Sequence, residues 1–328
     1  MKTSDCRHQT RNRNICNKMR FSLAALLSSM CIYLVDVTHT EERIKPSLSA
    51  SKFLSVRSRR MVGGTLAPHV PWQAMVYLND SLLDGGYAGG ALISSHWVLT
   101  AGRNLFINKT RQDTRSKDPI IPKVYLGISH RSEATPSKEV AVERVILHPN
   151  FQSQSDWDND LALIQLKHPV AIGSKVIPIP LPESNHAITG ASGVITGWGY
   201  GIYLTFAASL KHLVLPLVPR ADCKAEYENS QYTPTVDENM LCTGPTKYGE
   251  NVCMGDAGGA LAVKDPQSGD VVAAGILSYD KSCAQYKYGV YMELSKFMPW
   301  INSVIRGDKQ ESSALRKIAM AKMYSWQS

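Results

Sequence analysis

The chain has no surplus of charge beyond its first sixty residues. The whole sequence has a formal charge of +8, but residues 1–60 contain 12 Lys and Arg against 4 Asp and Glu, and the remainder holds 24 of each sign. Binding to nucleic acid depends on clustered cationic side chains. The charge balance therefore excludes nucleic acid as an expected partner of the folded part.

The sequence also lacks a clean membrane span. The apolar run from Phe21 to Val37 follows a basic stretch and is interrupted by polar residues, among them Asp36. A basic segment before a short apolar core is typical of a signal peptide. We expect a signal peptide over residues 1–40, starting at Met1 or at Met19, and a secreted, extracellular protein. The alternative is a retained signal anchor, which would make the protein a membrane-anchored interaction protein.

Cysteines are few, and three of the seven fall within the expected signal peptide. In an oxidising compartment the even number that remains indicates two disulfides, and the residues alone allow three pairings. Two N-x-S/T sequons, at Asn79 and Asn108, suit surface loops of a secreted glycoprotein. The four remaining cysteines are Cys223, Cys242, Cys253 and Cys283.

Residues 41–60 lack helical or strand periodicity and end in the basic sequence Arg57-Ser58-Arg59-Arg60. This ending is similar to a cleavage signal for a proprotein convertase. We expect a propeptide over 41–60, with cleavage after Arg60 and a new N-terminus at Met61. The alternative is a solvated basic linker that is never cut.

Long helical periods are absent between Met61 and Leu294. Short runs rich in Val, Ile, Leu and Tyr alternate with turn residues, which favours an all-β antiparallel sandwich or barrel over a parallel α/β sheet. Residues Ser295 to Ile305 have the apolar spacing of a terminal helix, and the basic tail 306–328 is either solvated or a second amphipathic stretch. The expected strand runs are Trp72 to Leu78, Ala91 to Leu99, Lys123 to Leu126, Leu161 to Leu166, Gly193 to Thr196 and Val271 to Leu277.

Ordered motifs follow a start at Met61-Val62-Gly63-Gly64 and Pro71-Trp72-Gln73. They are Gly89 to Ile93 (GGALI), Trp97 to Ala101 (WVLTA), Asp158 to Leu163 (DNDLAL), Thr196 to Gly199 (TGWG) and Cys253 to Gly259 (CMGDAGG). In this order the motifs resemble those of the trypsin-like serine proteases over residues 61–305. The resemblance implies two six-stranded antiparallel β-barrels with the active site in the cleft between them.

Two of the three catalytic side chains that the resemblance implies are missing. The histidine position falls on Arg103 and the nucleophile position on Ala257, so only the carboxylate, Asp160, is present. Alanine has no nucleophilic atom, and a guanidinium stays protonated and cannot act as a general base. Such losses cost about a factor of 10⁶ in turnover. We expect a pseudoprotease; an active hydrolase with a non-standard site is the alternative.

Arg103 has two open placements. Its guanidinium either forms a salt bridge to Asp160 in place of the imidazole–carboxylate pair, or it swings into solvent. The first placement compensates the charge of Asp160 within a partly buried cleft. In the second, other groups have to compensate that charge.

The activation apparatus that the resemblance implies is retained. In the family, the amine freed by cleavage pairs with the aspartate before the nucleophile, here Met61 with Asp256. Burying an ammonium is costly unless it is paired, so the pairing could order the neighbouring loop. That loop includes Gly255 and Ala257, whose N–H groups correspond to the oxyanion hole.

The specificity pocket is altered. Its base falls on Asn251, which is neutral where trypsin-like enzymes that select Arg or Lys have aspartate. The edge that pairs with substrate backbone reads Ser278, Tyr279 and Asp280, so a charged residue stands where the family has glycine. This change is either drift or a specialised new site.

The resemblance also implies a disulfide pairing, Cys223 with Cys242 and Cys253 with Cys283. Two further bridges of the family are absent at both ends. The positions where their cysteines would stand are Ala88 with Asn104 and Gly193 with Val263.

The resemblance implies a secreted serine protease homologue of the insect type, acting by protein binding. Homologues of this kind serve immune cascades and reproductive secretions in insects. We expect a cofactor, decoy or scaffold whose partners are active proteases, inhibitors or other extracellular proteins, with no cofactor and no metal ion. The altered loops Phe106 to Pro119 and Gly199 to Ala208 are candidate binding surfaces, because loops on a rigid scaffold commonly carry recognition.

Overall fold

The computed structural model describes most of the chain from Gly64 to Gly307. The expected signal peptide and propeptide lie outside the described residues, as do Met61, Asn79, Asn108 and residues 308–328 of the expected C-terminal tail. The described residues are 64–78, 86–107, 111–153, 156–183, 191–201, 205–228, 234–246, 250–265, 269–280, 283 and 287–307.

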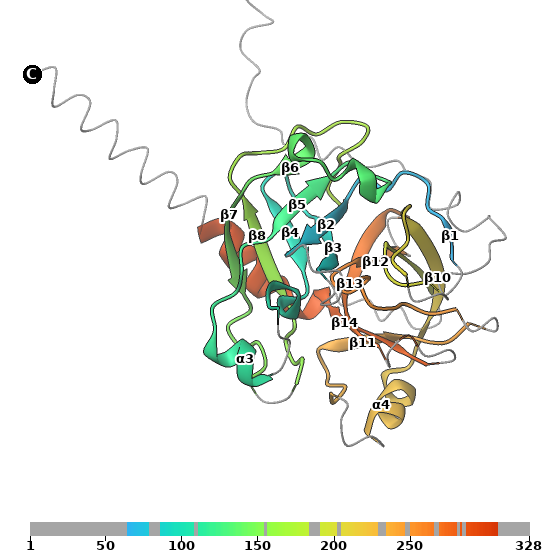
Figure 1. The fold of residues 1–328 in the computed structure, drawn as a ribbon. Coiled ribbons are helices and arrows are strands. Elements are labelled where there is room, and N and C mark those ends of the chain that lie inside the picture. The colour runs from blue at the N-terminus through green and yellow to red at the C-terminus, as the bar shows by residue number, and fades with distance from the viewer. Residues whose placement is uncertain are drawn as a thin grey trace, which may run out of the picture. The chain divides into compact units, whose positions relative to one another are not determined.

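The first sheet comes from the N-terminal half of the described chain (Figure 1). Its strands are β2 (Gln73–Tyr77), β3 (Tyr87–Leu92), β4 (Trp97–Thr100), β5 (Lys123–Leu126), β6 (Glu139–Val140), β7 (Val142–Leu147) and β8 (Ala162–Leu166). The order is β6-β5-β2-β3-β4-β8-β7, and within the described residues no ladder closes it. Only Ala141 separates β6 from β7. One bent run of chain therefore supplies both end strands of this half-barrel, β6 paired with β5 and β7 paired with β8.

The second sheet closes on itself. Its strands are β1 (Thr65–Leu66), β9 (Ser192–Gly197), β10 (Lys211–Val218), β11 (Met240–Thr243), β12 (Ala260–Lys264), β13 (Val271–Tyr279) and β14 (Gly289–Glu293). Strand β10 pairs with β9 as well as with β11, so six strands form a complete barrel and β1 is added at β10. The predicted all-β class with two barrel-like sheets is confirmed.

Burial explains why these segments form strands. Every residue of β13 is buried, because this strand lies between β12 and β14. From Leu213 onward strand β10 instead alternates, with Leu213, Leu215 and Leu217 buried and Val214, Pro216 and Val218 partly exposed. Apolar side chains with the period of a pleated strand therefore build the interior of the closed barrel.

One expected strand run is two strands. Ala91 to Leu99 contains the end of β3, a turn at 93–96, and the start of β4. In this turn the amide of Ile93 donates to the carbonyl oxygen of Trp97 over 2.9 Å. Ser94 and Ser95 favour such a turn because their hydroxyls compete for backbone hydrogen bonds. The run of apolar residues hid this break.

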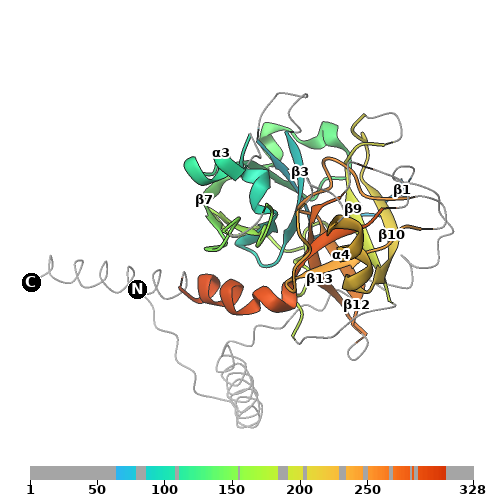
Figure 2. The ribbon, with the colours of Figure 1, turned by 90° about the horizontal axis from the view of Figure 1, so that it is seen from below.

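Helices are short except at the end of the chain. Residues 294–307 form the predicted C-terminal helix, in which Phe297 and Ile301 are buried (Figure 2). His148, which follows β7, packs against this helix, with ring centroids 5.2 Å from Phe297 and 4.9 Å from Trp300. Burial lowers the pKa of His148. The other helices within the described residues are α3 (Arg111–Ser116), α4 (Arg220–Glu228) and the 3₁₀ turns η2 (Gly102–Leu105), η3 (Arg131–Glu133) and η4 (Pro136–Lys138).

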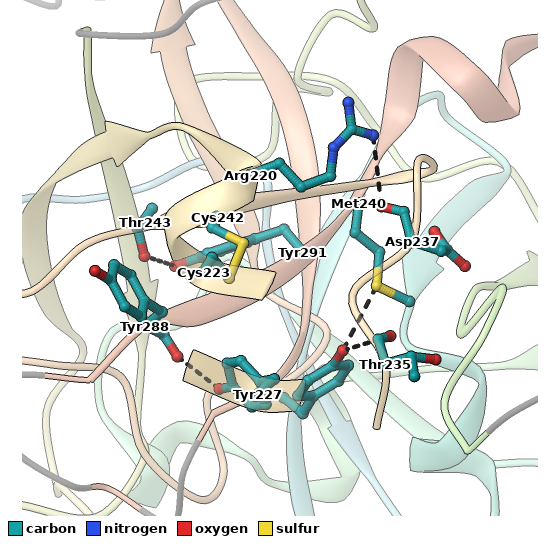
Figure 3. The surroundings of a disulfide bond; sticks show 11 residues. Arg220, Cys223, Tyr227, Thr235, Asp237, Met240, Cys242, Thr243, Tyr288 and Tyr291 are labelled. Carbon is teal, nitrogen blue, oxygen red and sulfur yellow. Dashed lines mark hydrogen bonds between the residues drawn. A yellow bond between two sulfur atoms is a disulfide. The ribbon is translucent and has the colours of Figure 1, made fainter. Parts of the chain in front are cut away.

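Two disulfides join Cys223 to Cys242 and Cys253 to Cys283, the pairs that the resemblance implies. The first fastens α4 to β11 (Figure 3). Beside it the Tyr227 hydroxyl donates to the carbonyl oxygen of Tyr288 over 2.8 Å. Within the described part of the chain, no helix has the length and apolar character needed to cross a membrane.

Candidate functional site

Asp160 is the retained carboxylate, and it lies at the junction of the two sheets. It precedes β8 in the first sheet and is fully buried. One carboxylate oxygen, Oδ1, accepts a hydrogen bond from the backbone amide of Arg103 at 2.7 Å. The other, Oδ2, accepts one from the hydroxyl of Ser278 in β13 at 2.6 Å. The structure therefore brings together three residues that lie far apart in the sequence.

The Arg103 side chain turns inward toward this carboxylate. Its Nε lies 3.6 Å from Asp160 Oδ2, which is an ion-pair distance, and the side chain is 17% exposed. The guanidinium carbon also lies 5.0 Å from the ring centroid of Trp157, a cation–π contact. Of the two expected placements, the structure has the ion pair. Nε makes no hydrogen bond, so charge attraction and the indole face hold the guanidinium.

Trp157 occupies a strained loop. Gln152, Trp157 and Asn159 have φ values of 51°, 63° and 49°, in the left-handed region that ordinary residues avoid at a cost of roughly 1–2 kcal/mol each. Arg115 of α3 fixes this loop, donating to the carbonyl oxygen of Gln152 at 2.9 and 3.1 Å and to that of Ser153 at 2.5 Å. The loop Phe106 to Pro119 thus supports the conformation that aims Trp157 at Arg103.

Ala257 stands at the expected nucleophile position, and its backbone is fixed from the first sheet. Its carbonyl oxygen accepts from the amide of Gly89 at 2.8 Å and from Asn104 Nδ2 at 2.8 Å. Gly258 follows with φ +91°, and a Cβ there would collide with the carbonyl oxygen of Gly89 and with Thr100 Oγ1. Only glycine fits this close approach.

Asn104 is a site residue that the motifs do not reveal. In the sequence it marks only the place of an absent cysteine, yet its amide, 1% exposed, connects η2 of the first sheet to the Ala257 loop of the second. No motif or spacing in the sequence points to Asn104, because its role depends on a contact with a residue 153 positions away in the chain. A buried amide has to find partners, and the nearest ones are Thr100 Oγ1 and Ala257.

Asp256 is buried, with 1% of its surface exposed. Its carboxylate accepts from the amide of Gly199 at 2.8 Å and from that of Cys253 at 3.0 Å. A Cβ on Gly197 or on Gly199 would collide with this carboxylate, which explains the glycines of the TGWG motif. Burial raises the pKa of Asp256 to about 7, and the charge of Asp280 adds to this, against the two amide hydrogen bonds.

The residues that the resemblance assigns to the specificity pocket are hydrogen-bonded to neighbouring backbone groups. Asn251 is buried, donating from Nδ2 to the carbonyl oxygen of Lys287 at 3.3 Å and accepting at Oδ1 from the amide of Val252 at 2.9 Å. Asp280 Oδ2 accepts from the amide of Cys283 at 2.8 Å, and burial raises the pKa of this carboxyl. The Asp280 carboxylate is thus tied to its own turn.

Tyr279 also turns away from solvent. Its hydroxyl donates to the carbonyl oxygen of Thr235 at 3.2 Å and lies 3.5 Å from the Met240 sulfur. Ser278 beside it is committed to Asp160. Of the edge that the resemblance assigns to substrate backbone, Ser278 therefore joins the two sheets and Tyr279 bonds to the segment before β11.

Comparison with known proteins agrees with this arrangement. A family model described as Trypsin matches residues 61–301. The chain belongs to the trypsin family. Haptoglobin from Oryctolagus cuniculus is 35% identical to it over 261 residues, covering 75% of this chain and 70% of the relative. Haptoglobin from Mesocricetus auratus is 35% identical over 263 residues, with the same coverage. Haptoglobin-related protein from Homo sapiens is 35% identical over 261 residues, again covering 75% and 70%.

Haptoglobins are non-catalytic homologues of the serine proteases, so these relatives support a pseudoprotease within the trypsin family. All three relatives come from mammals, whereas the resemblance of the motifs implies the insect type. The family assignment does not depend on that difference.

We predict that Arg103→Ala lowers the free energy of unfolding of this trypsin-family chain by about 1–3 kcal/mol, because Asp160 stays buried while losing a charged partner. Urea unfolding measures the change. Arg144→Ala is the matched control, since Arg144 is exposed and donates to Gln165 Oε1 at 2.6 Å. An effect of Arg103→Ala no larger than that of Arg144→Ala would contradict the ion pair.

We predict that the uncut chain loses stability as pH rises from about 4 to about 7. Asp256 has a pKa near 7 in the folded state against an ordinary value of 3.8, so the folded state holds more protons in this window. A difference of three pKa units corresponds to about 4 kcal/mol. Urea unfolding at several pH values gives the slope, which Asp256→Asn should flatten. Some slope should remain in Asp256→Asn, because the raised pKa of Asp280 contributes in the same direction. Equal slopes for the two proteins would contradict the role of Asp256.

Proposed function

We propose that this chain is a secreted, catalytically inactive member of the trypsin family that acts by binding another extracellular protein. The observation that carries the proposal is the methyl group of Ala257 at the nucleophile position, on a backbone fixed by the amides of Gly89 and Asn104. A methyl group cannot attack a carbonyl carbon. The relation to haptoglobins, which are non-catalytic homologues, supports the same conclusion.

Neighbouring hydroxyls do not replace the missing nucleophile. Ser278 is fully buried and donates to Asp160 Oδ2, and Thr100 is fully buried and donates to the carbonyl oxygen of Gly89 at 2.8 Å. Both hydroxyls are buried away from solvent and already hydrogen-bonded, so neither is presented to a substrate carbonyl. Arg103, which occupies the place of the base, remains a cation. Nucleophile and base are therefore both absent from the described site.

We further propose that cleavage after Arg60 by a proprotein convertase regulates binding. Asp256 is a buried carboxylate, and among the described residues no Lys or Arg lies within ion-pair distance of it. A buried carboxylate without a cation is costly, and the amine of Met61 is a cation that cleavage would supply. Met61 replaces the Ile or Val that is usual at this position in the family, so a longer unbranched side chain would accompany the amine.

Catalytic inactivity is tested with a fluorophosphonate probe that labels activated serines. We expect no labelling and no peptide hydrolysis by the cleaved chain, since the probe needs a nucleophilic hydroxyl. Active trypsin serves as the positive control. Stoichiometric labelling, or hydrolysis that survives purification and is lost on Asp160→Asn, would overturn the proposal.

Binding and its dependence on processing are tested by intact-mass analysis and a pull-down from the native fluid. We expect the chain that begins at Met61 to capture one or more extracellular proteins, and Arg60→Ala, which stays uncut, to capture much less. The cleaved Asp256→Asn chain is the matched control, because it has the free amine without its carboxylate partner. Equal capture by the cleaved and uncut forms would remove the regulation, and no capture by either would remove the binding function.

A further inference from the structure

An aromatic cluster lies beside the Ala257 loop, on segments that the catalytic motifs do not include. The Phe206 ring packs against Tyr87 of β3, with centroids 5.2 Å apart in a T-shaped contact, and against Tyr200, 4.3 Å away. Tyr77 of β2 extends the cluster, 4.9 Å from Tyr87. The described parts of the loop Gly199 to Ala208 are thus attached to the first sheet through their aromatic rings.

Arg131 of η3 fixes this cluster in position. Its Nε donates to the carbonyl oxygen of Ala207 at 2.8 Å, and Nη2 donates to that of Phe206 at 3.3 Å. Its guanidinium carbon lies 5.1 Å from the ring centroid of Tyr87 and 5.6 Å from that of Phe206. Its backbone amide donates to the carbonyl oxygen of Ala208 at 2.8 Å. Because the planar guanidinium of Arg131 donates to two carbonyl oxygens and stacks on two rings, the segment has little freedom to move.

The Phe206 ring also reaches the position assigned to the oxyanion hole. A Cβ built on Gly255 would lie 2.7 Å from Phe206 Cε1 and 3.1 Å from the Cα of Gly199, so the ring lies against the Gly255 backbone. Tyr200 is bound to the same loop, its amide donating to the carbonyl oxygen of Met254 at 2.9 Å. The aromatic cluster therefore touches both the first sheet and the loop that contains Ala257.

The Ala257 loop is hydrogen-bonded to β3 through the amide of Gly89 and to β13 through the carbonyl oxygen of Leu277. The aromatic cluster packs on the β3 side of this loop through Tyr87, whereas the altered edge Ser278 to Asp280 follows Leu277 on the β13 side. Asn251 and Asp280 bond to Lys287 and Cys283, whereas Phe206 contacts Tyr87 and Arg131. In acyl transfer the residue whose carbonyl is attacked occupies the specificity pocket, and the leaving group extends past the oxyanion donors in the other direction. Phe206 thus stands where the leaving-group part of a bound peptide would pass.

We infer that Phe206, fixed by Arg131 and Tyr87, is a built-in stopper that closes the leaving-group side of the former active site. An extended polypeptide cannot lie across Ala257 while this ring is in place. The partner in the proposed function therefore binds outside the former cleft. The inference rests on the assigned positions of Gly255 and Ala257 but needs no partner, so its test is independent of the binding function.

The test places a thiol at the closed position and measures access to it. Ala257→Cys is alkylated with iodoacetamide, which is small, and with fluorescein maleimide, which is bulky. We expect the maleimide reaction, relative to iodoacetamide, to be at least tenfold faster in Ala257→Cys/Phe206→Ala than in Ala257→Cys alone. Intact mass verifies that only one thiol is labelled and that both disulfides remain.

Thr205→Ala in the same background is the matched control, because Thr205 belongs to the same loop and is exposed; its relative rate should stay within twofold. Arg131→Lys keeps the charge but loses the fork of hydrogen bonds, and it provides the test if Phe206→Ala does not fold. We expect at least a threefold increase for it. Relative rates within twofold of Ala257→Cys for the folded variants would overturn the stopper.

Discussion

The buried carboxylate of Asp160 is the interaction on which the junction of the two sheets depends. It comes from the first sheet, and its hydrogen bonds come from Arg103 in the first and Ser278 in the second. A carboxylate away from water is tolerated only when its oxygens are bonded and its charge is compensated. Once the barrels pack in this way, Asp160 cannot be lost without leaving Ser278 and the Arg103 amide unpaired. Asp160 therefore has a structural role that does not depend on catalysis.

The same constraint decides what can stand in the place of the histidine. A residue there has to offer its backbone amide to Asp160 and bring a group that tolerates the neighbouring charge. Arginine does both, and its extra length is accommodated on the face of Trp157. That indole is in position because the loop adopts positive φ values and because Arg115 binds two of its carbonyls. The placement of Arg103 thus involves α3, which lies outside the motifs.

The class of fold could be predicted from the sequence because the strand runs are apolar with the right period, and β5 begins and ends where the run Lys123 to Leu126 does. The motifs pointed to Asp160, Asp256 and Ala257 as candidate site residues, and that assignment stays a prediction. Two roles could not be predicted, because they depend on the local backbone conformation. They are the hydrogen bond from the Asn104 amide to Ala257 and the contact of the Phe206 ring with Tyr87. Such contacts join segments far apart in the chain, and no spacing rule encodes them. The turn at 93–96 was missed although Ser94 and Ser95 mark it, because apolar residues flank it on both sides.

The Ala257 loop is held by two kinds of interaction that respond differently to processing. The bonds from Gly89 and Asn104 and the disulfide Cys253–Cys283 fix its backbone without reference to any terminus. The charge of Asp256 is different, since its two amide donors satisfy hydrogen bonding but do not neutralise it. A change at the terminus would therefore act on the loop mainly through this charge. Because Gly199 donates to Asp256 and leads into Tyr200 and Phe206, such a change would be transmitted toward the aromatic cluster rather than toward Arg103.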